Sequence, residues 1–247
     1  MFEFQSRLIF PTHAVPAAGP FPPRAERLEL KTSGGDELFG IHIPADEPTG
    51  RPTLILGFGG NAWNGQDVAQ YLHELFPEDE VVVFHYRGYA PSRGTASANA
   101  LIEDARLIYD FAVKRVKPKR VIGVGFSIGS GVAAELAAAR KLDGLILVTP
   151  FDSLKAVAQS MYPWLPIGPF FEHEINAALA IEKAKVPVAV IAAQFDQIVP
   201  SERTDALRHK VPKLLFDRTI FGAGHNDIYA RSEFQQSMRE ALAKLSP

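Results

Sequence analysis

Hydrophobic and polar positions along the chain follow a regular alternation from residue 53 onward. Short runs rich in Val, Ile and Leu alternate with segments whose apolar residues recur at helical spacing. The expected strands are 53–57, 81–85, 120–125, 144–148, 188–193 and 214–221, and the expected helices are 66–75, 99–116, 127–139, 153–160, 201–208 and 233–245. Strands that are apolar on both faces, each followed by a helix, predict an α/β fold with a mostly parallel, doubly wound sheet covered by helices on both faces.

The chain before residue 53 has a different character. Residues 11–23 are rich in proline, which cannot continue a helix, so we expect residues 1–26 to form an extended N-terminal arm. Residues 27–31 and 38–43 then read as two strands joined by the Gly-rich turn Ser33-Gly34-Gly35-Asp36, which predicts an antiparallel pair.

One segment interrupts the alternation of strands and helices. Residues 161–180 are rich in Pro and aromatic residues and are too long for a plain connection between a helix and a strand. We expect a small cap there. Residues 1–247 as a whole are expected to form a single domain, because α/β folds routinely use this length around one core.

Composition and charge narrow the possible partners. The chain has 26 Lys and Arg against 28 Asp and Glu, a net charge of -2, and therefore no broad cationic surface for nucleic acid. It has no Cys, which excludes disulfides, thiolate metal sites and a Cys nucleophile. The first ten residues lack the order of a secretory signal, and no apolar run approaches the ~20 residues of a membrane span. We expect a soluble, cytoplasmic protein; no feature indicates an oligomeric state.

Candidate chemistry begins at Gly125-Phe126-Ser127-Ile128-Gly129. This stretch follows an apolar strand and precedes an Ala-rich helix, the setting that a nucleophile elbow requires. A serine on such a turn has a strained backbone, and glycines two residues away on either side remove the resulting clash. The motif predicts Ser127 as a nucleophile; the alternative is a Gly-rich turn with an idle serine.

A serine nucleophile needs a base, and the base needs an acid that orients it. Reactive groups in an α/β sheet gather at the carboxyl ends of the strands. His225 follows the last expected strand and Asp196 the strand before it, in the chain order Ser, Asp, His. Asp152 is a rival acid, but it immediately precedes an expected helix and reads more readily as its N-cap.

An acyl-transfer site also needs donors for the developing oxyanion. We expect the backbone N–H of Ile128, at the start of the helix, to be one donor and the backbone N–H of Asn61, in the Gly-rich loop after strand 53–57, to be the other. This loop lacks the pattern of a phosphate-binding loop. The candidate substrate contacts are aromatic residues: Phe58, Trp63, Phe126, Tyr162 and Trp164.

Several motifs together resemble the α/β-hydrolase superfamily, and more narrowly its serine hydrolases of the Bem46 type. The similarity runs from about residue 28 to the C-terminus. Beside the Ser127 motif it rests on Gly59-Gly60-Asn61-Ala62-Trp63-Asn64, His85-Tyr86-Arg87-Gly88-Tyr89-Ala90, the segment from Thr149 to Leu154, and Asp196-Gln197-Ile198-Val199-Pro200. Three positions depart from the family pattern, with Gly59 in place of His, His85 in place of Asp, and Trp63 in place of a small residue.

The resemblance implies an eight-stranded α/β-hydrolase fold and hydrolysis of an ester, thioester or amide bond. The expected activity is that of a serine hydrolase acting on a small-molecule acyl ester or thioester through an acyl-enzyme, with no metal or organic cofactor. The alternatives are a peptidase or amidase of the same fold and a binding scaffold without catalysis. Tyr86 to Tyr89 are expected to be structural, because an Arg after a strand usually braces nearby loops.

Overall fold

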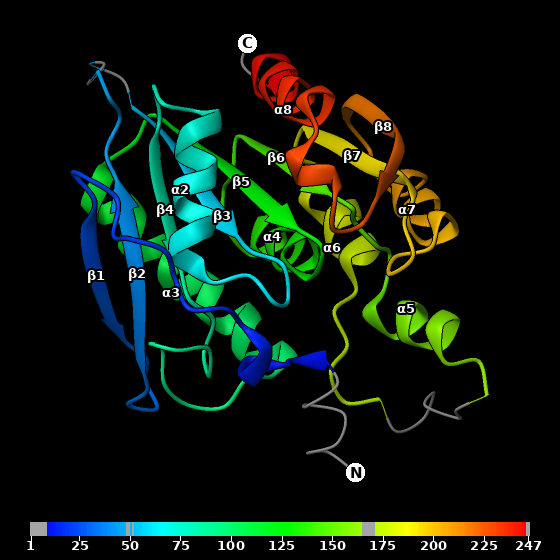
Figure 1. Ribbon diagram of the computed structural model, residues 1–247, viewed down its shortest axis with the longest axis horizontal. Helices are drawn as coiled ribbons and strands as arrows, with labels where there is room; N and C mark the ends of the chain where they lie inside the picture. The colour runs from blue at the N-terminus through cyan, green and yellow to red at the C-terminus, as the bar shows by residue number, and fades with distance from the viewer. Residues whose placement is uncertain (1–8, 48–49, 51, 165–170, 246–247) are drawn as a thin grey trace.

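The computed structural model describes residues 9–47, 50, 52–164 and 171–245. In this part of the chain, eight strands form one sheet in the order β1-β2-β4-β3-β5-β6-β7-β8 (Figure 1). Strand β2 runs antiparallel to β1 and to β4, and every other neighbouring pair is parallel. The strands are β1 Glu26–Lys31, β2 Glu37–Ile43, β3 Thr53–Phe58, β4 Glu80–Phe84, β5 Arg120–Phe126, β6 Gly144–Val148, β7 Val188–Phe195 and β8 Leu214–Gly224.

Helices cover both faces of this sheet. Helices α2 and α8 pack on one face, and α3, α4 and α6 pack side by side on the other. The helices are α2 Gly65–Leu75, α3 Ala98–Val116, α4 Ile128–Ala139, α5 Leu154–Met161, α6 Ala177–Ala184, α7 Ser201–Arg208 and α8 Ser232–Leu245, with short 3-10 turns η1 Thr12–Ala14 and η3 Ile228–Ala230. Each face buries its own hydrophobic cluster, so the central strands are apolar on both sides. This confirms the predicted eight-stranded α/β-hydrolase architecture.

The observed elements match the predicted ones with ends shifted by a few residues. The exceptions are the short turns η1 and η3 and the helix α6, which the sequence did not predict. Helix α6 begins at Ala177, inside the segment 161–180 that was expected to be a cap, and packs against α4 through Ala177, Ala180 and Ile181. Residues 165–170 of that segment lie outside the described residues.

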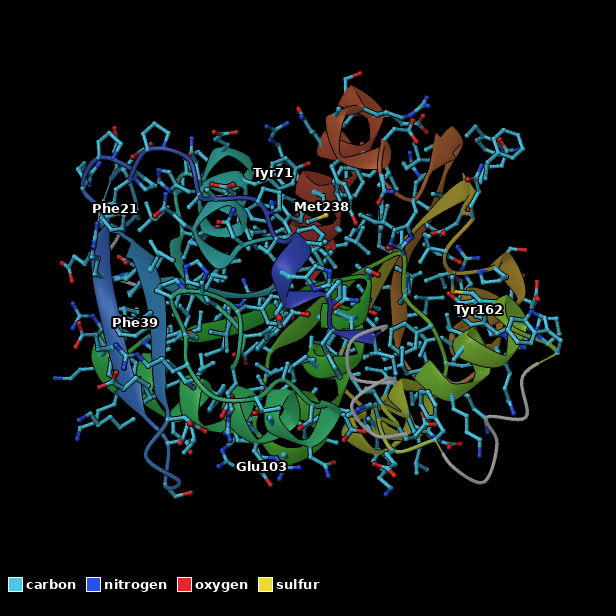
Figure 2. All side chains as sticks on the ribbon, turned by 60° about the horizontal axis from the view of Figure 1, so that its bottom comes forward. Phe21, Phe39, Tyr71, Glu103, Tyr162 and Met238 are labelled. Carbon is cyan, nitrogen blue, oxygen red and sulfur yellow. The ribbon has the colours of Figure 1, made fainter. Side chains whose placement is uncertain are left out.

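The N-terminal segment crosses from β1 past α2 to the edge where α4 begins (Figure 1). Its backbone is fastened to the start of α2, because Gly19 N–H donates to Asp67 Oδ1 at 3.1 Å and Gln66 Nε2 donates to Gly19 O at 2.7 Å. Phe10 is buried. Figure 2 shows Phe21 and Phe39 at the β1–β2 end of the molecule and Tyr162 at the opposite end. The segment therefore connects the antiparallel end of the sheet with the edge that carries the candidate site.

Candidate active site at the carboxyl edge of the sheet

Ser127 occupies the tight turn between β5 and α4. Its φ of 52° lies in the left-handed region, which is unfavourable for a residue with a side chain. Hydrogen bonds hold the turn in place: Ser127 N–H donates to Val148 O at 2.9 Å, and Ser127 O accepts from Ser130 N at 2.9 Å and Ser130 Oγ at 2.6 Å. The neighbouring strand and the first turn of α4 together offset the strain.

The two glycines of the motif are required by close backbone contacts. A Cβ atom at Gly125 would lie 2.3 Å from Gly129 O, and a Cβ atom at Gly129 would lie 2.2 Å from Phe58 O. Neither distance is possible for a real side chain, and the neighbouring atoms are backbone atoms that cannot rotate away. The glycines therefore allow the turn to pack against itself and against the end of β3.

The structure brings Ser127, His225 and Asp196 together. His225 follows β8, and its Nε2 lies 3.0 Å from Ser127 Oγ. Its Nδ1 lies 2.7 Å from Oδ2 of Asp196, which follows β7. A carboxylate can only accept, so Nδ1 carries the proton and Nε2 is left to accept from the serine hydroxyl. The arrangement has the geometry of a nucleophile, a base and an orienting acid.

Asp196 is fixed by its own loop. Its Oδ1 accepts from the backbone N–H groups of Ile198 at 2.9 Å and Val199 at 2.7 Å, which leaves Oδ2 for the imidazole. The side chains of Asp196 and His225 are 5% and 9% exposed. This pair is therefore largely shielded from water, and the carboxylate has one orientation.

Asp152 has a different partner and a different role from the one expected. Its Oδ2 lies 3.3 Å from Nη1 of Arg203, at the start of α7. The N-cap of α5 is Ser153, whose Oγ accepts from Ala156 N–H at 3.2 Å. The prediction that Asp152 caps this helix is wrong by one residue, because the helix starts at Leu154 rather than at 153.

The expected oxyanion donors, Ile128 and Asn61, come from two different segments next to Ser127. Ile128 is the first residue of α4, so its N–H has no acceptor within the helix. The loop after β3 approaches Ser127, and a Cβ atom at Gly60 would lie 3.9 Å from Ser127 Cβ. Asn61, Ser127 and Ile128 line one cavity.

This cavity has a volume of about 220 Å³ and is mostly apolar. Helix α5 supplies one wall, and the loop between β7 and α7 supplies another. Besides Asn61, Ser127 and Ile128, the lining residues are Ile9, Phe151, Leu154, Val157, Ala158, Met161, Tyr162, Ile198 and Val199. Only one of the five expected substrate contacts, Tyr162, is among them.

Two of the expected contacts belong to the core. Phe58 and Phe126 are 3% and 0% exposed and pack in the two hydrophobic clusters. They stand at the ends of the central strands β3 and β5, where the side chains on both faces are covered. The side chains of these two residues are therefore covered by the core and are not among those that line the cavity.

Trp63 and Trp164 are not among the residues that line the cavity. The Trp63 ring packs against Phe126, Tyr71 and Tyr229, with centroid distances of 5.3, 5.4 and 5.1 Å. Trp164 is 76% exposed and meets Tyr162 edge-on. Trp63 thus belongs to an aromatic cluster that includes Phe126, the residue before Ser127.

Sequence reasoning missed two residues near Asp196 and His225, Thr149 and the partly buried Tyr229. Thr149 follows β6 with a φ of 46° and is 1% exposed. The pKa of Tyr229 is raised to about 12, mainly by burial; Thr149 acts to lower this pKa, and the nearby carboxylate of Asp196 acts to raise it. No sequence pattern marks a positive φ at a β-branched residue such as Thr149. Tyr229 lies between the last expected strand and the last expected helix, where the sequence has no motif that singles it out.

Metal sites and membrane-spanning helices can be assessed for the residues that the structure describes. No group of three or more His, Asp or Glu side chains is arranged to hold a metal ion in them. No helix found in the same ranges has the length and apolar character needed to cross a bilayer.

Comparison with known families and proteins shows that the chain is similar to alpha/beta hydrolases. The model of the alpha/beta hydrolase family matches residues 54–217. An uncharacterized protein of Mycobacterium tuberculosis is 31% identical over 233 residues, which cover 90% of this chain and 81% of that protein. The lysophosphatidylserine lipase ABHD12 of Danio rerio is 27% identical over 229 residues, which cover 79% of this chain and 59% of the lipase.

Solved structures resemble this one in fold. An esterase of Pyrococcus furiosus superposes with a TM-score of 0.72 at 20% identity, covering 95% of this chain and 97% of the esterase. An alpha-beta hydrolase from Vibrio vulnificus superposes with a TM-score of 0.78 at 17% identity, covering 98% and 93% of the two chains.

Proposed function

Because this chain belongs to the alpha/beta hydrolase family, we propose that it is a serine hydrolase that cleaves an acyl ester or thioester through an acyl-enzyme. The observation that carries the proposal is the continuous hydrogen-bonded line from Ser127 Oγ to His225 Nε2, at 3.0 Å, and from His225 Nδ1 to Asp196 Oδ2, at 2.7 Å. The line ends on a serine held at a strained turn beside an apolar cavity.

In the first half of the reaction, Ser127 Oγ forms a bond to the acyl carbonyl carbon while its proton passes to His225 Nε2. The bond to the leaving alcohol or thiol then breaks, and the imidazolium returns the proton to that group. Asp196 stays ionised throughout and stabilises the positive imidazole. The acyl group is left on the serine oxygen.

In the second half, water takes the place of the alcohol. His225 accepts a proton from the water as its oxygen bonds to the acyl carbon, and the bond to Ser127 Oγ breaks as that oxygen regains its proton. The products are a carboxylic acid and free enzyme. In both halves the backbone N–H groups of Ile128 and Asn61 stabilise the negative oxygen of the tetrahedral intermediate.

The apolar cavity favours a substrate with a hydrocarbon acyl chain. Its walls from α5 and the loop after β7 offer hydrocarbon surface, and each buried methylene stabilises a complex by about 0.8 kcal/mol. The relatives include a lipase of lysophosphatidylserine and an esterase, which agrees with acyl ester chemistry. We propose that the substrate is a small molecule, that no cofactor takes part, and that the protein acts in the cytoplasm.

Steady-state hydrolysis of nitrophenyl esters and acyl thioesters of graded chain length tests the proposal. The wild-type protein should turn over at least one series, and Ser127→Ala should remove the activity down to the residual that binding and oxyanion stabilisation provide. Ser237→Ala is the matched control, because Ser237 is also buried but its hydroxyl only donates to Glu233 O on α8. Retention of activity in Ser127→Ala would exclude the proposed nucleophile.

A further inference from the structure

Two tyrosines from the loop after β4 hold the loop that carries Asn61. Tyr86 Oη donates to Gly59 O at 2.8 Å, and Tyr89 Oη donates to Asn61 Oδ1 at 2.8 Å. Asn61 Nδ2 in turn donates to Ile9 O in the N-terminal segment. Both ends of the Asn61 side chain are therefore engaged, one by Tyr89 and the other by the backbone of a segment far away in the sequence.

Both phenols are buried where they make these bonds. Tyr86 and Tyr89 are 8% and 2% exposed, and their rings meet edge-on at 5.8 Å. Burial raises the pKa of each hydroxyl well above its usual value, so both remain protonated donors over the whole working range of the protein. A buried phenol without its acceptor would lose a hydrogen bond that water could not readily replace.

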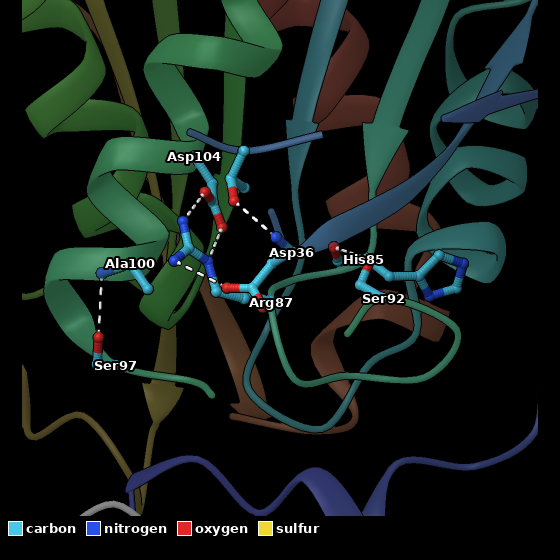
Figure 3. A network of polar contacts seen from close by, with 8 residues as sticks. Asp36, His85, Arg87, Ser92, Ser97, Ala100 and Asp104 are labelled. Carbon is cyan, nitrogen blue, oxygen red and sulfur yellow. Dashed lines mark hydrogen bonds and ion pairs between the residues drawn. The ribbon is translucent and has the colours of Figure 1, made fainter. Parts of the chain in front are cut away.

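The loop that presents the two tyrosines is itself braced (Figure 3). Arg87 donates to both carboxylate oxygens of Asp104 on α3 and to Asp36 in the turn between β1 and β2. The side chain of Asp104 is 3% exposed. Ser92 Oγ donates to His85 O at 2.8 Å. The tyrosines thus project from a loop that is fixed to α3 and to the turn between β1 and β2 and is bonded to itself through Ser92.

On the basis of the proposed function, we infer that Tyr89 is a positioning residue for oxyanion stabilisation, acting through the side chain of Asn61. The N–H of Asn61 belongs to the residue that Tyr89 and Ile9 hold from two sides, and Tyr86 holds the same loop two residues earlier. Donors of an oxyanion hole work because they are already in place when charge develops, and misplacement by about 1 Å can cost ~10²-fold in rate. The side chain of Asn61 therefore matters, although the donor itself is backbone.

Tyr89→Phe tests this inference, since it removes one oxygen and keeps the ring. We expect kcat to fall by ~10-fold or more, KM to change by less than about twofold, and the affinity for an alkyl trifluoromethyl ketone, which forms a tetrahedral adduct, to fall in parallel with kcat/KM. Tyr109→Phe is the matched control, because its hydroxyl donates to Lys141 O at 2.6 Å on the outer side of α3. It should leave kcat and the ketone affinity unchanged.

A double-mutant cycle separates action through Asn61 from a general loss of packing. Asn61→Ala should lower kcat on its own, and adding Tyr89→Phe to it should have little further effect, because both changes break the same link. Asn61→Ala alone also tests the inference if Tyr89→Phe does not fold. Additive effects on kcat, or a wild-type kcat and ketone affinity in Tyr89→Phe, would overturn the inference while leaving Ser127 as the nucleophile. Activity retained in Ser127→Ala would instead refute the proposed function.

Discussion

At the scale of single residues, the two carboxylate oxygens of Asp196 have different hydrogen-bond partners. Oδ1 accepts from the backbone of its own loop, and Oδ2 faces His225 Nδ1. Because the loop fixes the carboxylate, the imidazole is held in the tautomer that leaves Nε2 free to accept from Ser127.

Asp196→Asn should lower kcat by up to ~10⁴-fold with little change in thermal midpoint, because the amide favours the wrong tautomer of the imidazole while keeping the shape of the side chain. Asp152→Asn is the matched control: Asp152 pairs with Arg203, whereas His225 Nδ1 faces Asp196. It should keep kcat near the wild-type value. Measuring kcat and the thermal midpoint of both variants checks the assignment, and the reverse pattern would move the acid role to Asp152.

The hydrogen-bonded set of Ser127, His225 and Asp196 could be predicted, because the motif, the chain order and the positions after strands all agree. The substrate contacts could not, since an aromatic residue at the end of a strand has the same sequence signal whether it faces a cavity or the core. Phe58 and Phe126 belong to the core, whereas apolar residues of α5, such as Val157 and Met161, line the cavity. Which face of a short helix meets the cavity depends on packing that a single sequence does not contain.

At the scale of elements, the unit of strand β5, the Ser127 turn and helix α4 depends on close backbone packing. The end of β3 lies against Gly129 so closely that no side chain fits there. The same contact brings the loop with Asn61 to the nucleophile. Strand β3 and helix α4 thus position the two sides of the expected oxyanion site against each other.

Gly129→Ala should therefore destabilise the fold by about 1–3 kcal/mol and remove most of the activity, since either α4 or the end of β3 must shift. Gly50→Ala is the control, because nothing lies within 4 Å of a Cβ atom at that position. Its free energy of unfolding should stay within about 0.5 kcal/mol of wild type. Chemical denaturation of the two variants checks this, and equal unfolding free energies would show that the contact at Gly129 is not tight.

The sheet itself was predictable because each strand is a short, distinct apolar run. Helix α6 was not, because it follows a Pro-rich and aromatic stretch and its apolar face is made of Ala177, Ala180 and Ile181. Helix α6 buries this face by packing against α4, and that contact between distant segments is not encoded in the local sequence of α6.

At the scale of the whole molecule, His85 lies where β4, α2 and the N-terminal segment meet. Its Nδ1 accepts from Gly65 N–H at 3.2 Å at the start of α2, and the ring is 6% exposed. Burial lowers its pKa from 6.5 to about 4, although the nearby Asp67 acts in the opposite direction. The folded ring is therefore neutral at the pH where the unfolded ring becomes charged.

This difference makes stability depend on pH. Below about pH 6.5 the unfolded chain binds a proton that the folded chain does not bind until about pH 4, so the free energy of unfolding falls as pH falls between these values. Between pH 7.5 and 4.5 the free energy of unfolding of the wild type should fall by roughly 2–3 kcal/mol more than that of His85→Asn. The asparagine keeps a hydrogen-bond acceptor but does not titrate. Urea unfolding at both pH values measures the difference, and parallel losses in the two proteins would contradict it.

The proposed hydrolase activity depends on Ser127 being the residue that reacts. Labelling with a fluorophosphonate, followed by peptide mass spectrometry, tests this most directly, because such reagents form a covalent bond to an activated serine oxygen. We predict one adduct, on the peptide with Ser127, that is absent in Ser127→Ala, strongly slowed in His225→Ala and unchanged in Ser237→Ala. Hydrolysis of acyl esters by a protein that carries no adduct, or an adduct on another residue that abolishes the activity, would contradict the account.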